Sequence, residues 1–211
     1  MKYLLFFIIL LPLEGYNQIF KSDFNIKKSP MIYAEIDGGL SNGVMLGIYG
    51  NVRLNNIWGV NIGYNHYNKN SKELPTDYYS GFCLWDCTPT DKYFIYSFNV
   101  TRSFNTKTQF IRFKVELGLA LVQLEQVHFH PVIKNQWATI GSNYYETHST
   151  YHNKGISVRV VTEFPFSQVT GLQVAVLGTL TKKRSFVGIQ FGMTFGYVRE
   201  KFKHLGKKNK D

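Results

Sequence analysis

His66, Ser71 and Glu73 are the residues of this chain whose types come nearest to those of a hydrolytic site. A serine nucleophile needs a base that takes its proton and an acid that orients the base. The surrounding segment HYNKNSKE is polar, which is typical of a solvated loop, and no nucleophile-elbow motif surrounds the serine. The sequence therefore predicts no catalytic residue, and acyl transfer through these three residues stays an alternative.

Four histidines in the second half of the chain are candidates for metal binding. His128 and His130 are two residues apart, so they share one face of an extended strand. Together with a third ligand such as His148 they could hold a transition metal, and His152 lies nearby in the sequence. Their spacing matches no fixed zinc motif. We therefore expect neither a metal nor a cofactor.

Cys83 and Cys87 lie in the sequence FCLWDC and are the two cysteines of the chain. In an exported protein, two cysteines in one loop are expected to form a disulfide. The ring that this bond closes is small, so it would stiffen the tip of a loop and would not hold the fold together. A redox-active pair more usually has the spacing C-x-x-C beside a helix.

These residues must be positioned by β-strands, because a two-residue alternation of apolar with polar or small residues recurs along the chain. We expect eight strands, at 31–40, 43–54, 56–66, 92–104, 109–124, 154–164, 169–180 and 185–198. The last one, SFVGIQFGMTFGYV, shows the pattern most clearly. It has large apolar residues on one face and three glycines, a glutamine and a threonine on the other.

The apolar face of these strands is expected to point outward into lipid. It carries roughly thirty large side chains, more than the interior of an eight-stranded barrel can hold, and glycines on the other face suit a narrow lumen. Aromatic residues gather near the strand ends, as in the girdles of membrane barrels: Tyr33, Trp58, Tyr64, Phe104, Phe110, Phe164, Phe186 and Tyr197. The predicted fold is all-β, an eight-stranded antiparallel up-and-down transmembrane β-barrel, and these features disfavour a soluble lipocalin-type barrel.

Charged residues recur on the face of the strands that is expected to line the lumen. Four acids and four bases belong to this set: Glu35, Asp37, Glu116 and Glu163, with Arg53, Arg112, Lys114 and Arg159. Buried charges must be paired, so we expect a closed network of salt bridges that fills the lumen. A proton or ion pathway is the alternative, although an eight-stranded barrel is too narrow for an aqueous channel.

The same charges predict how the fifth and sixth strands are aligned. In one register Arg112 lies opposite Glu163. That register also brings Glu116 opposite Arg159 and keeps the apolar residues of both strands on one face. A shift of one residue would turn every side chain to the other face, so we expect this register.

Two connections are long, 67–91 and 125–153, and an up-and-down barrel places both at the same end. Both contain several aromatic residues, which are frequent anchors of binding interfaces. Alternatively, these aromatics pack on one another or lie among lipid headgroups. We expect function to reside in these two loops.

The two ends of the chain read as targeting and accessory segments. Residues 1–18, with Lys2 and a short apolar run, have the pattern of a signal peptide. A lead of 19–30 precedes the barrel at 31–198, and a basic tail follows at 199–211. The formal net charge of +10 is concentrated partly in this tail, which lacks the interleaved aromatics of a nucleic-acid site. We expect no nucleic-acid partner.

The stretch from 31 to 198 resembles the small eight-stranded outer-membrane barrels of Gram-negative bacteria, the OmpA-like or OmpX-like barrels. The most specific element is the last strand, in which Gln190, Gly192, Phe195 and Tyr197 match the signal read by the barrel assembly machinery. The resemblance implies a location in the outer membrane, with outer-membrane lipids and this machinery as partners. The family signal usually ends the chain, whereas a tail follows it here.

The function expected from the sequence is that of a non-catalytic outer-membrane protein. Its role would be structural, or one of adhesion or recognition, carried by the loops 67–91 and 125–153, for a surface ligand that the residues do not specify. Two other functions stay open. One is a lipid A-modifying enzyme of the acyltransferase or deacylase type, and the other is an accessory subunit of a secretion or envelope complex.

Overall fold

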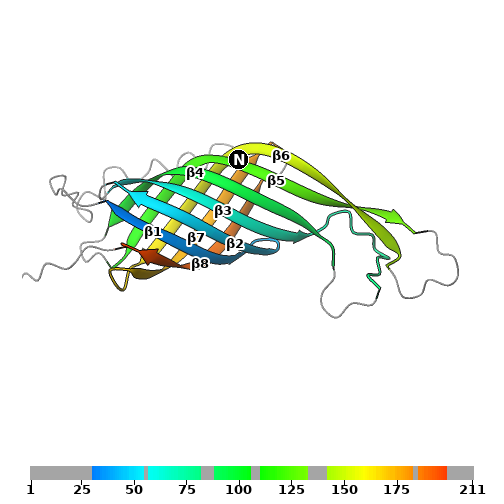
Figure 1. Ribbon diagram of the computed structural model, residues 1–211, viewed down its shortest axis with the longest axis horizontal. Coiled ribbons are helices and arrows are strands. Elements are labelled where there is room, and N and C mark those ends of the chain that lie inside the picture. The colour runs from blue at the N-terminus through cyan, green and yellow to red at the C-terminus, as the bar shows by residue number, and fades with distance from the viewer. Residues whose placement is uncertain are drawn as a thin grey trace, which may run out of the picture.

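The chain folds into a closed β-barrel in a computed structural model (Figure 1) that describes residues 30–54, 57–81, 88–105, 110–132, 142–182 and 185–198. The strands are β1 (Met31–Leu40), β2 (Val44–Arg53), β3 (Trp58–Asn70), β4 (Thr90–Asn105), β5 (Arg112–Pro131), β6 (Tyr144–Phe164), β7 (Thr170–Thr181) and β8 (Phe186–Gly196). The segments 1–18 and 199–211 and both cysteines lie outside the described residues.

Each strand pairs antiparallel with the next, and β1 closes the ring by pairing with β8. The predicted fold class, eight antiparallel strands in up-and-down order, is therefore confirmed. Closure gives every strand two neighbours, which removes the free edges of an open sheet. Among the described residues, no helix is long and apolar enough to cross a lipid bilayer.

The outward face of the barrel is apolar, as the alternation predicts. Ile62, Leu119 and Phe191 are 64%, 71% and 62% exposed, although side chains of this kind are normally buried in water-soluble proteins. Their neighbours along each strand point inward and are buried or half-buried. This arrangement exposes an apolar wall far larger than the patches that soluble monomers carry.

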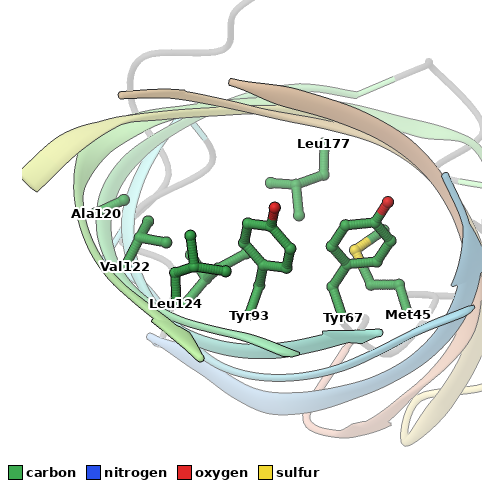
Figure 2. Close-up of a cluster of buried hydrophobic side chains, with 8 residues drawn as sticks. Met45, Tyr67, Tyr93, Ala120, Val122, Leu124 and Leu177 are labelled. Atoms are coloured by element: carbon green, nitrogen blue, oxygen red, sulfur yellow. The ribbon is translucent and has the colours of Figure 1, made fainter. Parts of the chain in front are cut away.

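The lumen is polar only in part, and here the prediction of a polar or small inner face was incomplete. Towards the end away from the termini, the inward residues form an apolar cluster: Met45, Tyr67, Tyr93, Ile95, Ala120, Val122, Leu124 and Leu177. Figure 2 shows the labelled members pointing from the wall into the barrel. Because buried polar atoms without partners are costly, apolar side chains fill the space that the charged layer does not reach.

The prediction that Tyr33 and Phe186 belong to an aromatic girdle was wrong, for the same reason in both cases. Tyr33 points into the lumen, is 4% exposed and donates a hydrogen bond to Glu163 Oε1 at 3.0 Å. Phe186 packs against the apolar cluster, with its ring 5.7 Å from that of Tyr67. Both residues lie on the inward parity of their strands, so position near a strand end alone did not identify the girdle.

The second long connection is mostly β-hairpin, whereas the sequence predicted a loop over 125–153. β5 and β6 stay paired as far as Pro131 opposite Tyr144 and extend beyond the rest of the barrel (Figure 1). The strand β7 ends at Thr181, opposite Gly155, so 144–154 pairs only with β5 among the described residues. The apolar alternation stops there, and this explains why the extension was missed.

Candidate functional site

The structure brings the predicted charged residues together inside the barrel. All eight are buried, between 0% and 4% exposed. Seven of them are joined by ion pairs, which link Glu35, Asp37, Glu116 and Glu163 to Arg112, Lys114 and Arg159. Arg53 lies near the terminal end of the lumen, where its Nη1 is 3.8 Å from Met31 Sδ.

The alignment of β5 with β6 places two of these charge pairs directly opposite each other. Arg112 faces Glu163, and Glu116 faces Arg159. The predicted register is therefore confirmed. Arg112 Nη1 lies 2.9 Å from Glu163 Oε2, and its Nη2 donates to the backbone oxygen of Val198 at 2.7 Å.

Arg159 is the centre of the charged layer. Its guanidinium contacts three carboxylates: Glu35 at 2.7 Å, Asp37 at 2.5 Å and Glu116 at 3.3 Å. The guanidinium also lies over the ring of Tyr49, 3.8 Å from its centroid. A planar guanidinium with five donors suits such a site because it can bind several carboxylates at once.

Lys114 links the two halves of the layer. Its Nζ lies 2.8 Å from Glu116 and 2.9 Å from Glu163, and it also contacts Glu35. The side-chain amides complete the network, since Gln173 Nε2 donates to Glu35 Oε2 at 3.0 Å and Asn51 Nδ2 donates to Glu35 Oε1 at 2.8 Å. Ion pairs with satisfied hydrogen bonds are the form in which buried charge is tolerated.

These contacts fill the lumen with a charged layer and an apolar layer. An eight-stranded barrel has an interior that side chains just fill, and the described side chains occupy it in this way. The geometry supports a structural role for the charged residues, because each of the seven charges in these ion pairs has a partner from another strand, and Arg53 also has a partner in the structure. An ion pathway has no support in this arrangement.

A second assembly of residues lies at the end of the barrel away from the termini. We call it the protruding lobe, and it comprises residues 71–81, 126–132 and 142–153. Asn143 joins its parts, since its Oδ1 accepts from Tyr79 N at 2.7 Å and its Nδ2 donates to Asp77 O at 2.6 Å. The backbone N–H of Asn143 donates to Tyr79 O at 3.2 Å. The first long connection is thereby held against the hairpin.

Aromatic side chains pack where the two parts of the lobe meet. The rings of Tyr78 and Tyr144 are each in contact with Phe129, with centroids 5.5 and 6.3 Å away. Tyr144 donates its hydroxyl to Asp77 at 2.8 Å, and this hydrogen bond raises the pKa of the phenol. Partial burial, together with a hydrogen bond to Glu146, raises the pKa of Tyr78. Both phenols therefore stay protonated donors at neutral pH.

The residues considered for acyl transfer have separate partners in the structure. The ring of His66 packs against Phe94 with centroids 4.9 Å apart. Ser71 is buried and donates to Val127 O at 3.5 Å, whereas Glu73 lies 2.8 Å from His128 Nδ1. No nucleophile–base hydrogen bond joins Ser71 to His66 among the described contacts, so this geometry lacks the arrangement that such chemistry needs.

The histidines of the hairpin lie on two different faces. The register places His128 beside Thr147, whereas His148 lies beside Val127, one position away on the opposite face. His130 Nε2 lies 3.0 Å from Thr147 Oγ1. The alternative of a metal held by His128, His130 and His148 was therefore wrong, and the described residues contain no group of side chains arranged to hold a metal ion.

The residues of the predicted assembly signal lie on β8 and just after it. Gln190 is buried, and its amide contacts Asn65 and Tyr49 in the lumen. Gly192 lies between Asp37 and Gln173 on the neighbouring strands. Phe195 and Tyr197 are 40% and 37% exposed. Gln190 and Gly192, which face the lumen, therefore also take part in packing the barrel interior.

Sequence reasoning missed the residues that join the two parts of the lobe. Asp77, Asn143 and Glu146 were not singled out, although each bonds a residue far away in the sequence. They lie in polar segments without periodicity, and an aspartate or asparagine in a loop usually bonds its own backbone. The aromatic residues in both long connections were the one feature of the sequence that could have indicated that the two parts of the lobe pack together.

Comparison with known proteins identifies the fold. No protein-family model and no curated protein matches the chain by sequence. The structure is similar to the N-terminal β-barrel domain of Pseudomonas aeruginosa OprF, with a TM-score of 0.53 and 12% identity, over 78% of this chain and 95% of that domain. A major outer membrane protein from Thermus thermophilus gives a TM-score of 0.51 and 10% identity, over 80% of this chain and 99% of that protein. The resemblance to small outer-membrane barrels is thus confirmed in fold.

Proposed function

We propose that this chain is a non-catalytic outer-membrane barrel protein that recognises a ligand at the cell surface through its protruding lobe. The proposal joins two features: a rigid barrel with a filled interior and a lobe that projects from one end of it. Recognition residues commonly lie on loops that a rigid scaffold positions. The similar solved structures support the fold, and the geometry of the lobe supports the function.

The location in the outer membrane is supported by the apolar wall. Only helices and closed barrels satisfy every backbone group within lipid, and this barrel is closed and apolar outside. Short connections lie at the end that holds the termini, as periplasmic turns do. We therefore place the lobe outside the cell. The signal peptide at 1–18, the lead at 19–30, the disulfide Cys83–Cys87 and the reading of β8 by the barrel assembly machinery belong to the same proposal.

The single observation that carries the proposal is that the lobe is organised and still exposes aromatic rings. Tyr79 and Tyr145 are 54% and 57% exposed, and Tyr145 stacks on His130 with ring centroids 4.9 Å apart. Tyrosine is among the residues that dominate binding energy at interfaces. The ring of Tyr145 is stacked and the backbone of Tyr79 is hydrogen-bonded to Asn143, so both residues lose less conformational freedom on binding, which favours affinity.

Replacing Tyr79 and Tyr145 with alanine together is expected to reduce ligand binding at least tenfold while leaving the barrel folded. Cells that display the full chain would be compared with cells that display the variant, by adhesion to serum-coated plates and to epithelial monolayers. A tenfold loss of affinity corresponds to about 1.4 kcal/mol of binding free energy. This is a small effect for the removal of two aromatic side chains from an interface.

The matched control is Phe166→Ala, because Phe166 is an equally exposed aromatic, 58%, at the opposite end of the barrel. It should leave adhesion unchanged. Trimming both long connections to short turns should abolish adhesion and keep the folded barrel. Full adhesion by the trimmed protein, or no adhesion by the full chain above that of cells lacking it, would overturn the proposal.

A further inference from the structure

Two lysines lie at the lobe end of a part of the outer wall whose other described residues are uncharged. Lys154 precedes Gly155, whose partner across the β6–β7 ladder is Thr181, and Lys182 follows Thr181. Lys154 therefore lies on β6 and Lys182 directly follows the end of the adjacent strand β7, each one position beyond the last pair. Both side chains are exposed.

Neither lysine has a carboxylate partner among the described residues. From Lys154 to the terminal end, the outward positions of β6, β7, β8 and β1 hold no aspartate or glutamate. Like charges at neighbouring positions of adjacent strands are destabilising. An anion bound between the lysines would relieve this repulsion, and nothing in the described chain supplies one.

The wall directly below the lysines fits a hydrocarbon chain. Ile156, Leu180 and Val187 are 48%, 51% and 64% exposed there. Gly178 has no side chain to cover this surface, and a Cβ added to it would meet only Val158 O, at 3.8 Å. The site thus pairs two cations that lack a carboxylate partner among the described residues with an exposed apolar surface beneath them.

We propose that Lys154 and Lys182 bind the phosphate group of a membrane lipid whose acyl chain lies along the wall at Gly178. A phosphorylated lipid carries both of the required features, an anion at the interface and a chain in the hydrocarbon layer. Each lysine near an anionic lipid surface contributes about 1 kcal/mol to the attraction. This inference rests on the membrane location proposed above.

Lys92 serves as the matched control for Lys154 and Lys182, because it lies opposite a carboxylate. It is also an exposed lysine near the lobe end of the outer wall, but the β4–β5 register places it opposite Glu125. A carboxylate beside a lysine weakens its attraction for an anion. We therefore expect Lys92 to contribute little to lipid binding.

The test uses the full chain in a neutral detergent with added bis-phosphorylated lipid A, and native mass spectrometry measures the bound lipid. The double variant Lys154→Gln/Lys182→Gln is expected to lower the apparent affinity roughly thirtyfold, the effect of two surface lysines. Lys92→Gln should change it less than threefold, and Lys154→Arg/Lys182→Arg should retain it. Dephosphorylated lipid A should bind no better to the full chain than to the double variant.

Three results would overturn the inference: unchanged affinity in the double variant, equal affinity for dephosphorylated lipid A, or complete displacement by millimolar inorganic phosphate. The last would assign the site to free phosphate. Migration of unboiled samples on a denaturing gel checks that each variant is folded. Failure of the full chain to float with lipid vesicles would instead contradict the membrane location, so the two failures are distinguishable.

Discussion

Replacing Arg159 with methionine is expected to lower the free energy of unfolding by about 3–5 kcal/mol, the usual cost of removing one partner of a buried ion pair. The guanidinium contacts Glu35, Asp37 and Glu116, all of which are buried. Without it, these three carboxylates share the single nearby ammonium of Lys114, which contacts two of them. Methionine preserves much of the side-chain volume. The loss of stability would therefore come from the missing charge and not from a cavity.

Urea unfolding of the purified protein in lipid vesicles would measure this loss, with the folded fraction read from the gel band of unboiled samples. Lys92→Met, a matched loss of one exposed cation outside the lumen, should change the unfolding free energy by less than about 0.5 kcal/mol. Adding Asp37→Asn to Arg159→Met should recover part of the loss, because Arg159 is the ion-pair partner of Asp37 and Lys114 contacts Glu35 and Glu116 instead, so this change removes the charge left uncompensated. A loss below about 1 kcal/mol for Arg159→Met would contradict the structural role of the charged layer.

Gly192→Ala is expected to destabilise the barrel by about 3 kcal/mol, at the upper end of the usual range for overpacking. An added Cβ would overlap Asp37 Oδ1 and the backbone oxygen of Ile36. The backbone cannot withdraw because β1 and β8 are paired there, with Asp37 opposite Gly192. The carboxylate of Asp37 would have to move, which disturbs the hydrogen bond that its Oδ1 accepts from Gln173 Nε2.

Gly178→Ala is the matched control on the outer face, where the added Cβ has open space. It should change stability by no more than about 0.5 kcal/mol. Both variants would be compared by the same unfolding assay. Equal effects of the two substitutions would show that the loss comes from strand propensity and not from the crowded lumen at Gly192.

The barrel could be predicted from the sequence because one rule of alternation holds for every strand. Residues such as Ile62 and Phe191 must be apolar outside, and their neighbours must be small or polar inside a narrow lumen. The charges of Arg112 and Glu163 then fixed the alignment of β5 with β6, since a slip of one residue would expose them to lipid. The apolar alternation and the charge pairs favour the same alignment of β5 with β6. The sequence therefore predicted the register of these two strands as well as the fold class.

Other features depend on contacts that no local pattern specifies. Tyr33 looked like a girdle residue, but its hydroxyl bonds Glu163 in the lumen. The hairpin extension of β5 and β6 lacks an apolar face, so its strands have no periodic signal. Asn143 joins the lobe through hydrogen bonds to Asp77 and Tyr79, residues distant in sequence, and such pairings follow only from the completed fold.

Migration of the full chain on a denaturing gel before and after boiling, after extraction from the outer-membrane fraction, would test whether the protein is a closed transmembrane barrel. A closed transmembrane barrel has no free strand edge and resists cold detergent. We therefore expect the unboiled protein to run as a compact band that shifts on boiling. Identical migration of the two samples, with the protein in the soluble periplasmic fraction, would contradict the account.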